Sequence, residues 1–296
     1  MSVRSRLWQG EAMRPPRFAR AAFRRLPPRT RNALLHRAGL FAPWEDGFDL
    51  SPPSLGPDEV VGPPDFVGIG VQKAGTSWWY ALIAEHPGVF ARDDLHKERH
   101  YLVHLAAAPF GIAEVEDYHG WFPRRPGTMT GEWTPDYLCA PWVPGLLTRA
   151  APDARLLVML RDPVERFRSG FSFRLSMGAP DTDATVADAV RQGFYSRWLR
   201  GYLDCFPIEQ ILVLQYERCV ADPAGQLSAT YGFLGLDGYR PADLRRSVNA
   251  SGTKRPLDPD ARHRLRELYR PDAEDLVSLF PTIDLSLWPN FADHAA

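Results

Sequence analysis

The feature that most constrains this chain is a glycine-rich loop, Gly70 to Trp78, which directly follows the apolar run Phe66-Val67-Gly68-Ile69. An apolar run, a glycine-rich turn and a hydroxyl-bearing helix start together predict a strand–loop–helix unit. In such a unit the backbone N–H groups of the loop point inward, and the helix dipole favours an anion at the helix N-terminus. The segment therefore predicts a cradle for a phosphate group.

The position of the lysine in this loop separates the candidate chemistries. A Walker A loop has its lysine immediately after the second glycine, where it reaches the β- and γ-phosphates of a nucleoside triphosphate. Here Thr76 takes that place, and Lys73 lies two residues before Gly75. A strand–turn–helix corner also carries glycine for steric reasons alone, so the loop by itself leaves a purely structural alternative open.

A second segment, residues 155–171, predicts another strand followed by a helix. Residues 155–160 are almost continuously apolar, which is typical of a buried parallel strand. Pro163 suits the first turn of the helix that follows. Arg161 at the strand end and Ser169 two turns further on are able to grip one phosphate by charge-assisted hydrogen bonds. The alternative is an ordinary helix whose arginines face water.

Together, the two segments resemble the cofactor motifs of the sulfotransferases that use 3′-phosphoadenosine 5′-phosphosulfate (PAPS). The loop is similar to the family's 5′-phosphosulfate loop, and Arg161 and Ser169 occupy the anchoring positions of its 3′-phosphate motif. The resemblance covers roughly Asp65 to Trp288. Within the family, this segment is similar to bacterial members and to the heparan sulfate enzymes. It implies an α/β fold with three layers, a central parallel sheet and a P-loop-type phosphate cradle. We expect this domain to span residues 61–296.

The resemblance also implies the cofactor chemistry: PAPS as sulfuryl donor, adenosine 3′,5′-bisphosphate (PAP) as product, and no metal. Lys73 is the candidate for stabilising the charge that develops on the leaving oxygen. Trp78 either stacks on adenine or packs in the core, and a basic loop near the C-terminus is expected to close over the 3′-phosphate. The full set of cofactor candidates is Lys73, Ala74, Gly75, Thr76, Ser77, Trp78, Arg161, Ser169, Tyr195, Lys254 and Arg255.

Titratable side chains concentrate between His96 and Leu102. This segment resembles the Lys-Glu-x-His-aromatic segment of the heparan sulfate branch, where the glutamate removes the acceptor proton. Glu98 is therefore the expected base, and we expect partial burial to raise its pKa toward neutrality. The small-molecule branch uses a histidine, which keeps His100 and His96 as rivals. The alternative is that Glu98 only pairs with Lys97 or Arg99 on a solvated turn. Lys97 is also a candidate for orienting the sulfuryl group.

Residues 131–137 depart from the heparan sulfate pattern. Trp133 stands where those enzymes usually have a lysine near the sulfuryl group and the sugar acceptor. It is either an aromatic wall that favours a flatter or more apolar acceptor, or a packing residue. We expect loops at residues 106–125 and 178–188 to form the acceptor pocket. The acceptor is accordingly a small molecule or a carbohydrate, sulfated on a hydroxyl in preference to an amine.

Composition sets the broad class of protein. The chain has 296 residues and a formal net charge of −1, which suits one α/β domain and gives no basic character for nucleic-acid binding. Cys139, Cys205 and Cys219 have neither metal-ligand nor paired spacing, which favours free thiols in a reducing compartment, the cytoplasm. Richness in Arg, Ala and Pro indicates a bacterial source. No run approaches the length of a membrane-spanning helix.

Residues 1–60 are expected to form a basic N-terminal extension and linker. Before residue 40 there are ten arginines and one acidic residue, Glu11. Such an arm either touches an anionic membrane or an acidic partner, or packs on the domain through apolar residues such as Phe18 and Phe23. The arm lacks the continuous apolar core of a secretory signal, so export is not expected.

The sequence thus predicts a PAPS-dependent sulfotransferase that works by in-line transfer, with Glu98 as base and Lys73 stabilising the leaving group. Two other classes stay open. An atypical P-loop nucleotide kinase requires magnesium and a carboxylate near the loop to hold it. A non-catalytic nucleotide-binding module would have no use for the catalytic pair of Glu98 and Lys73.

Overall fold

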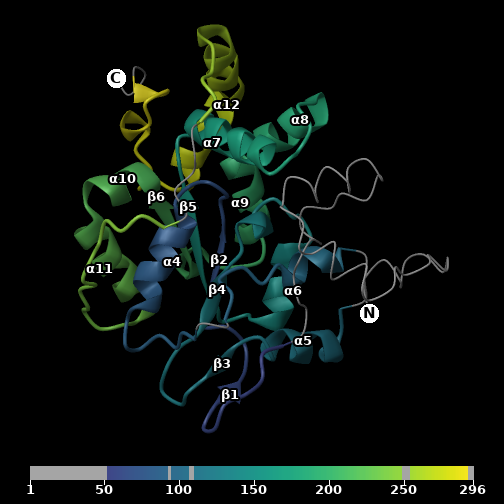
Figure 1. The fold of residues 1–296 in the computed structure, drawn as a ribbon, viewed down its shortest axis with the longest axis vertical. Helices are drawn as coiled ribbons and strands as arrows, with labels where there is room; N and C mark the ends of the chain where they lie inside the picture. The colour runs from purple at the N-terminus through teal and green to yellow at the C-terminus, as the bar shows by residue number, and fades with distance from the viewer. Residues whose placement is uncertain (1–51, 93–94, 107–109, 249–253, 293–296) are drawn as a thin grey trace, which may run out of the picture.

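A four-stranded parallel sheet forms the centre of the fold (Figure 1). The computed structural model describes residues 52–92, 95–106, 110–248 and 254–292. The strand order is β4-β2-β5-β6, formed by β2 (Phe66–Gly70), β4 (Gly131–Trp133), β5 (Arg155–Leu160) and β6 (Ile211–Gln215). A separate antiparallel pair joins β1 (Val60–Val61) to β3 (Pro123–Arg124), so β1 spans the domain boundary expected at residue 61.

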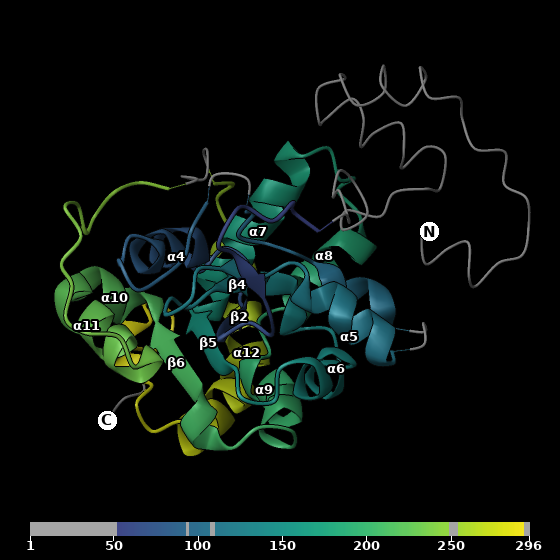
Figure 2. The same ribbon diagram turned by 90° about the horizontal axis from the view of Figure 1, so that it is seen from below.

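Helices cover both faces of this sheet, which confirms the expected three-layer α/β fold. Figures 1 and 2 show α4 (Thr76–Ala84), α10 (Tyr216–Ala221) and α11 (Pro223–Leu234) on one side. The other side carries α6 (Val143–Ala150), α9 (Tyr195–Leu203) and α12 (Pro259–Leu279). The remaining elements are α5 (Ile112–His119), α7 (Pro163–Ser176), α8 (Asp183–Arg191) and the short 3₁₀ turns η1 (Tyr101–Leu105), η2 (Pro135–Tyr137), η3 (Ile208–Gln210) and η4 (Leu285–Leu287).

The two middle strands are buried, as their continuous apolar runs predict. All five residues of β2 are buried, and β5 has the bounds expected from the sequence, with only Arg155 partly exposed. Gly68 allows the close approach of β2 to β4, because a Cβ there would lie 2.0 Å from the Trp133 ring. Both strands therefore end at fixed positions at one edge of the sheet, where their following loops meet.

Three of the helices begin with the same Asp-Pro pair. The carboxylates of Asp162, Asp222 and Asp258 cap α7, α11 and α12 by accepting hydrogen bonds from backbone N–H groups of the first turn. The proline that follows each aspartate has no N–H to leave unsatisfied, and its fixed φ suits the first helical position. Asp162 also accepts hydrogen bonds from the backbone and side chain of Asn290, which fixes the start of α7.

Several segments differ from the sequence expectation in their local structure. The segments 106–125 and 178–188, expected as loops, contain α5 and the start of α8. The basic extension up to Ser51 and most of the loop before Lys254 lie outside the described residues. Within the part of the chain that the structure describes, no helix is both long and apolar enough to cross a membrane.

Candidate active site

A cleft of about 970 Å³ opens where the loops after β2, β5 and β6 meet. The carboxyl edge of a parallel sheet is the usual ligand position in such folds. The residues that line the cleft come from the glycine-rich loop, the 98 and 135 positions, α7, α10 and a segment before α12: Gln72, Lys73, Gly75, Thr76, Ser77, Trp78, Glu98, Pro135, Arg161, Ser169, Phe173, Ser176, Met177, Tyr216, Val220, Arg245, Arg246, Ser247, Val248 and Lys254.

The glycine-rich loop has the backbone shape that a phosphate cradle needs. Gly75 has φ 93°, and a Cβ at this position would lie 2.8 Å from the Tyr216 ring, so only glycine fits without strain. α4 begins at the next residue, Thr76, and this residue and Ser77, in the first turn of the helix, line the cleft. Arg161 Nη1 donates to the Lys73 carbonyl at 3.2 Å, which ties the loop to the end of β5.

Three cations converge in the cleft without an acidic partner. Among the described residues, none of Lys73, Arg161 and Lys254 forms an ion pair with a carboxylate. Burial and the charges of Lys254 and Arg161 lower the pKa of Lys73, and burial and Arg161 lower that of Lys254. Arg161 Nε and Gln72 Oε1 are buried with no hydrogen-bond partner among the described residues. An anionic ligand with several oxygens fits this demand for negative charge.

The other cofactor candidates divide into those that line the cleft and those that support it. Ser169 lines the cleft on α7, and Trp78 lines it while its indole Nε1 donates to the Leu244 carbonyl at 2.9 Å. Tyr195 is buried, and its hydroxyl donates to the Arg161 carbonyl at 2.8 Å, so it holds the backbone of the arginine from behind. Arg255 does not line the cleft and pairs with Asp181 at 2.7 Å. Among the loop residues, Thr76 and Ser77 line the cleft and Ala74 is buried behind it.

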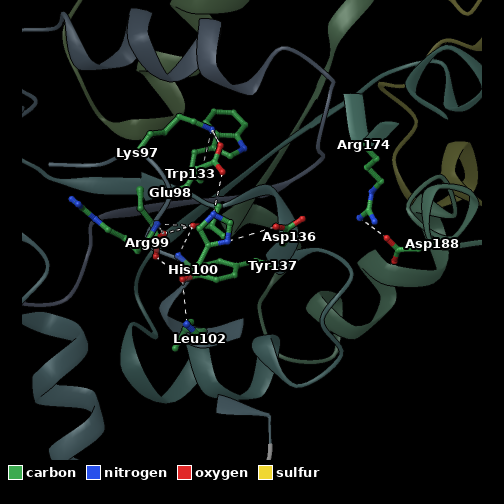
Figure 3. Close-up of polar contacts among 12 residues, drawn as sticks. Lys97, Glu98, Arg99, His100, Leu102, Trp133, Asp136, Tyr137, Arg174 and Asp188 are labelled. Carbon is green, nitrogen blue, oxygen red and sulfur yellow. Dashed lines mark hydrogen bonds and ion pairs between the residues drawn. The ribbon is translucent and has the colours of Figure 1, made fainter. Parts of the chain in front are cut away.

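Glu98 also lines the cleft, and it lies at the centre of a chain of polar side chains that includes Lys97, His100 and Asp136 (Figure 3). Its two oxygens contact Lys97 Nζ at 2.6 Å and His100 Nε2 at 3.2 Å. His100 Nδ1 lies 3.6 Å from Asp136 Oδ2. Of the three candidate bases, only Glu98 lines the cleft; the His100 side chain is buried and His96 is exposed away from the cleft.

The pKa of Glu98 differs from the sequence expectation. Burial raises it, but hydrogen bonds from His100 and Lys97, together with their charges, outweigh burial and lower the pKa to about 2. The expected rise toward neutrality was therefore wrong, because the sequence shows the carboxylate without the geometry of its two basic neighbours. Glu98 is ionised throughout the neutral range and is able to accept a proton there.

A buried carboxylate under this loop holds it to the sheet. Glu132 on β4 is fully buried and accepts hydrogen bonds from the hydroxyls of Tyr118 at 2.8 Å and Tyr137 at 3.0 Å. Its other oxygen accepts from the Arg99 backbone N–H at 3.1 Å and the Thr134 hydroxyl at 2.6 Å. These bonds fix the backbone immediately after Glu98, so the base candidate is positioned by the core of the domain.

Trp133 takes the packing role of the two that the sequence left open. It is fully buried, packs over Gly68 of β2, and its indole Nε1 donates to the Gly70 carbonyl at 2.9 Å. It does not line the cleft. Lys97 Nζ contacts the Trp133 carbonyl at 3.2 Å and Thr76 Oγ1 at 3.4 Å, between Glu98 and the glycine-rich loop.

Several residues of the site were missed from the sequence. Phe173, Ser176 and Met177 follow Ser169 at helical spacing and line the cleft with it, which the periodicity of α7 predicts once Ser169 is assigned. Arg245 and Arg246 form an adjacent basic pair before the expected basic loop. Tyr216 at the start of α10 lines the cleft, and its ring centre lies 4.8 Å from the Arg161 guanidinium. Charge pairs and aromatic contacts of this kind depend on the fold.

Comparison with known proteins gives a consistent result. Residues 112–241 match the profile of the Sulfotransferase family. Human heparan sulfate glucosamine 3-O-sulfotransferase 6 is 31% identical over 247 residues, which cover 70% of this chain and 69% of that protein. The human 3B1 enzyme of the same name is 30% identical over 246 residues, covering 70% of this chain and 61% of that protein. The chain thus spans about three fifths to two thirds of the length of these two relatives.

A solved structure matches the fold over most of the described chain. The sulfotransferase from Alicyclobacillus acidocaldarius superposes with a TM-score of 0.63 at 24% sequence identity, covering 77% of this chain and 99% of that one. This likeness concerns the arrangement of the strands and helices. It includes the central parallel sheet whose carboxyl edge carries the cleft.

Proposed function

Because this chain belongs to the sulfotransferase family, we propose that it transfers a sulfuryl group from PAPS to an acceptor hydroxyl, with an amine as the less favoured acceptor. The observation that supports this most is that Lys73, Arg161 and Lys254 line one cleft together with the ionised Glu98. This combination supports anion recognition and proton acceptance on one bound molecule.

We call the part of the cleft lined by the glycine-rich loop, Arg161, Ser169, Tyr216 and Lys254 the donor half. Its groups suit a nucleotide with phosphates at two positions. We assign the 5′-phosphate to the backbone N–H groups of Gly75, Thr76 and Ser77, since they open α4 and the loop has the left-handed turn that exposes them. Arg161 and Ser169 are assigned to the 3′-phosphate, because both side chains line the cleft.

The rest of the donor assignment completes the set proposed from the sequence. Lys254 adds a second cation near Arg161, and Trp78 and Tyr216, whose rings contact each other edge to face and line the cleft, are assigned to the adenine base. Arg255 and Tyr195 act behind this layer, one on the surface and one on the Arg161 backbone.

Lys73 stabilises the leaving oxygen in this proposal. Bound PAPS supplies the sulfuryl group and a phosphate leaving group, and the bridging bond between sulfur and phosphate oxygen breaks as the acceptor oxygen attacks. The Lys73 ammonium has no carboxylate partner among the described residues and lies 4.3 Å from the centre of the Phe173 ring. An ammonium placed where negative charge develops lowers the barrier most when it does not have to leave another partner first.

Glu98 accepts the acceptor proton in this proposal. With a pKa of about 2 the carboxylate is a weak base, so proton transfer occurs late, when the forming bond to sulfur has made the hydroxyl strongly acidic. Lys97 and His100 hold the carboxylate by hydrogen bonds to both oxygens and orient it toward the cleft. His100 is a positioning residue here, since its buried ring contacts Glu98 and does not line the cleft.

We base the proposed acceptor class on the names of the relatives and the proposed compartment on the cysteines. The names of the relatives specify a heparan sulfate glucosamine, which makes a glycan one acceptor class for this chain and a small alcohol the other. The three cysteines are unpaired in the structure, and we propose a reducing compartment such as the cytoplasm.

Calorimetric titration with PAP tests the donor site directly. ADP and ATP with magnesium serve as parallel ligands. We expect PAP to bind without metal and more tightly than either control, because only PAP presents phosphate to both Arg161 and the glycine-rich loop. Preference for ATP with magnesium would contradict the proposal and favour a P-loop kinase. Transfer of ³⁵S from labelled PAPS to an acceptor then tests catalysis.

A further inference from the structure

We propose that the acceptor is an uncharged alcohol or phenol with an apolar body, and that the C-terminal turns of α7 recognise this body. The inference rests on the proposed sulfuryl transfer and adds the chemical class of the acceptor. It concerns the end of the cleft beyond Lys73, lined by Glu98, Pro135, Phe173, Ser176 and Met177.

One helix face connects the donor half of the cleft to this end. Ser169, Phe173 and Met177 follow each other at four-residue spacing, so they lie in one row along α7. Phe173 sits where transfer must occur, because Lys73 Nζ lies 4.3 Å from its ring centre. Lys97 Nζ lies 2.6 Å from Glu98 and 3.4 Å from Thr76 Oγ1, so the proposed base lies next to the glycine-rich loop that carries Lys73. An acceptor hydroxyl between Glu98 and Lys73 therefore leaves its body against Phe173 and Met177.

The side chains offered to that body are mainly apolar. Phe173 is 37% exposed, one of the few large hydrophobic side chains in the described residues with this much exposure. Pro135 and Met177 add an apolar wall on either side. The Ser176 hydroxyl donates to the Phe173 carbonyl at 2.7 Å, so its donor capacity is already used. Such a surface gains from covering an aromatic or alkyl group.

Charge at this end disfavours an anionic acceptor. Among the described residues, the cleft-lining cations other than Lys73 are assigned to the donor half: Arg161 with Tyr216, Lys254 near Arg161, Arg245 with the Val220 carbonyl, and Arg246 with Glu85. The arginines around the C-terminal half of α7 have carboxylate partners, Arg174 with Asp188 and Arg255 with Asp181. Figure 3 shows Arg174 and Asp188 facing each other near Asp136.

The carboxylates next to the acceptor position already have partners: Glu98 contacts Lys97 and His100, and Asp136 contacts His100. Among the described residues, the cleft-lining cations without a carboxylate partner are Lys73, Arg161 and Lys254, which the proposal assigns to the donor, so a sulfated or uronate-containing glycan would bring its own charges against apolar side chains. The acceptor end thus differs from what the names of the heparan sulfate relatives indicate for those proteins.

A matched pair of ligands tests the charge part of this inference. We propose to titrate 2-naphthol and 6-hydroxy-2-naphthoate into the complex of the protein with PAP; both carry the same rings and hydroxyl, and only the second is an anion at pH 7. We expect 2-naphthol to bind at least about tenfold more tightly, because both ligands bury the same rings and only the naphthoate has to bring a carboxylate out of water against the mainly apolar side chains. Equal or tighter binding of the naphthoate would overturn the inference.

Variants on α7 test the proposed contact. Phe173→Ala should weaken 2-naphthol binding about tenfold, and Met177→Arg should raise the affinity for 6-hydroxy-2-naphthoate by placing a cation at the end of the cleft. Phe171→Ala is the matched control, because Phe171 stacks on Phe167 and does not line the cleft. PAP affinity should stay unchanged in all three variants. If Phe173→Ala and Phe171→Ala have the same effect on naphthol binding, α7 does not recognise the acceptor.

Transfer of ³⁵S from labelled PAPS to 2-naphthol, heparan sulfate and unsulfated heparosan completes the test. We expect label on 2-naphthol at a rate at least about tenfold above that on either glycan, in line with the expected difference in binding. Preference for a glycan, or label on no acceptor while PAP still binds, would overturn the acceptor inference and leave the donor site standing. Failure to bind PAP at all would instead overturn the proposed function.

Discussion

The two halves of the cleft are built in different ways. The donor half consists of loops and helix starts that directly follow buried strands: Gly75 after β2, Arg161 after β5 and Tyr216 after β6. The acceptor half combines segments that are distant in sequence, with Glu98 before η1, Pro135 after β4 and Met177 at the end of α7. In our proposal, anion recognition depends on local backbone geometry, whereas acceptor recognition depends on side chains that only the complete fold brings together.

The two halves also differ in whether their charged side chains have ion-pair partners. In the donor half, Lys73, Arg161 and Lys254 face each other without carboxylate partners among the described residues, and burial with mutual repulsion lowers the pKa of both lysines. In the acceptor half, Lys97 pairs with Glu98 and Arg174 with Asp188. The cations of the donor half are therefore available for an anionic ligand, whereas the ion pairs of the acceptor half hold its own side chains in place.

The largest expected effect comes from removing the base of the acceptor half. Glu98→Gln keeps the shape of the side chain and its contact distance to His100, but cannot accept the acceptor proton. We expect turnover to fall by about 10²- to 10⁴-fold, the usual range for a general base. PAP affinity should change little, which calorimetry checks alongside the transfer assay. Unchanged turnover would remove Glu98 from the mechanism.

Arg161→Ala should produce the next largest effect, confined to the donor half. Loss of one charge-assisted contact typically costs about 1.5–3 kcal/mol, so PAP should bind about 10- to 100-fold more weakly. AMP, which lacks the 3′-phosphate, is the control ligand, and its affinity should change much less. An equal loss for PAP and AMP would show that Arg161 supports the loop through the Lys73 carbonyl and does not read the 3′-phosphate.

A third prediction compares two partly buried glutamates with opposite pKa shifts. Beneath the donor half, burial raises the pKa of Glu217 to about 7, although it accepts a hydrogen bond from the Asp162 backbone N–H. A folded-state pKa above the unfolded value means that the native state binds more protons between pH 4.5 and about 7. Glu217 therefore makes the protein less stable as pH rises through this window. Glu98, with its lowered pKa, acts in the other direction and only at lower pH.

Denaturation by urea at pH 5 and pH 8 measures this effect. Glu217→Gln removes the titration, so the free energy of unfolding of the variant relative to the wild type should improve by about 1–2 kcal/mol from pH 5 to pH 8. The Trp288 indole, which donates to Glu217 at 3.1 Å, can donate to the amide oxygen of Gln as well. A pH-independent difference would show that the Glu217 carboxyl keeps its ordinary pKa.

The donor half was largely predictable from the sequence because short motifs determine it. The strand over residues 155–160, the helix start at Pro163 and the cofactor loop all have the expected bounds, and Lys73, Arg161 and Ser169 reach one cleft. Each of these features depends on neighbours within a few residues, such as the Asp162 cap or the turn at Gly75.

The acceptor half was less predictable because its properties depend on contacts between distant segments. The lowered pKa of Glu98 requires both Lys97 and His100 to fold back onto the same carboxylate. The burial of Trp133 depends on the absence of a side chain at Gly68, on another strand. Residues 112–119 form a helix that a loop expectation missed, and its Tyr118 hydroxyl reaches the buried Glu132. None of these pairings has a local sequence signature.

The row of side chains along α7 sets a fixed distance between two parts of the cleft. From Ser169 to Met177 the chain advances eight residues, about 12 Å at the rise of an α-helix, and Asp162 anchors the start of that helix to the core. In our proposal, the distance between the 3′-phosphate and the acceptor body is therefore set by the length of one helix. Substitutions at the C-terminal end of α7 would then change the acceptor in evolution without moving Ser169 in the donor half.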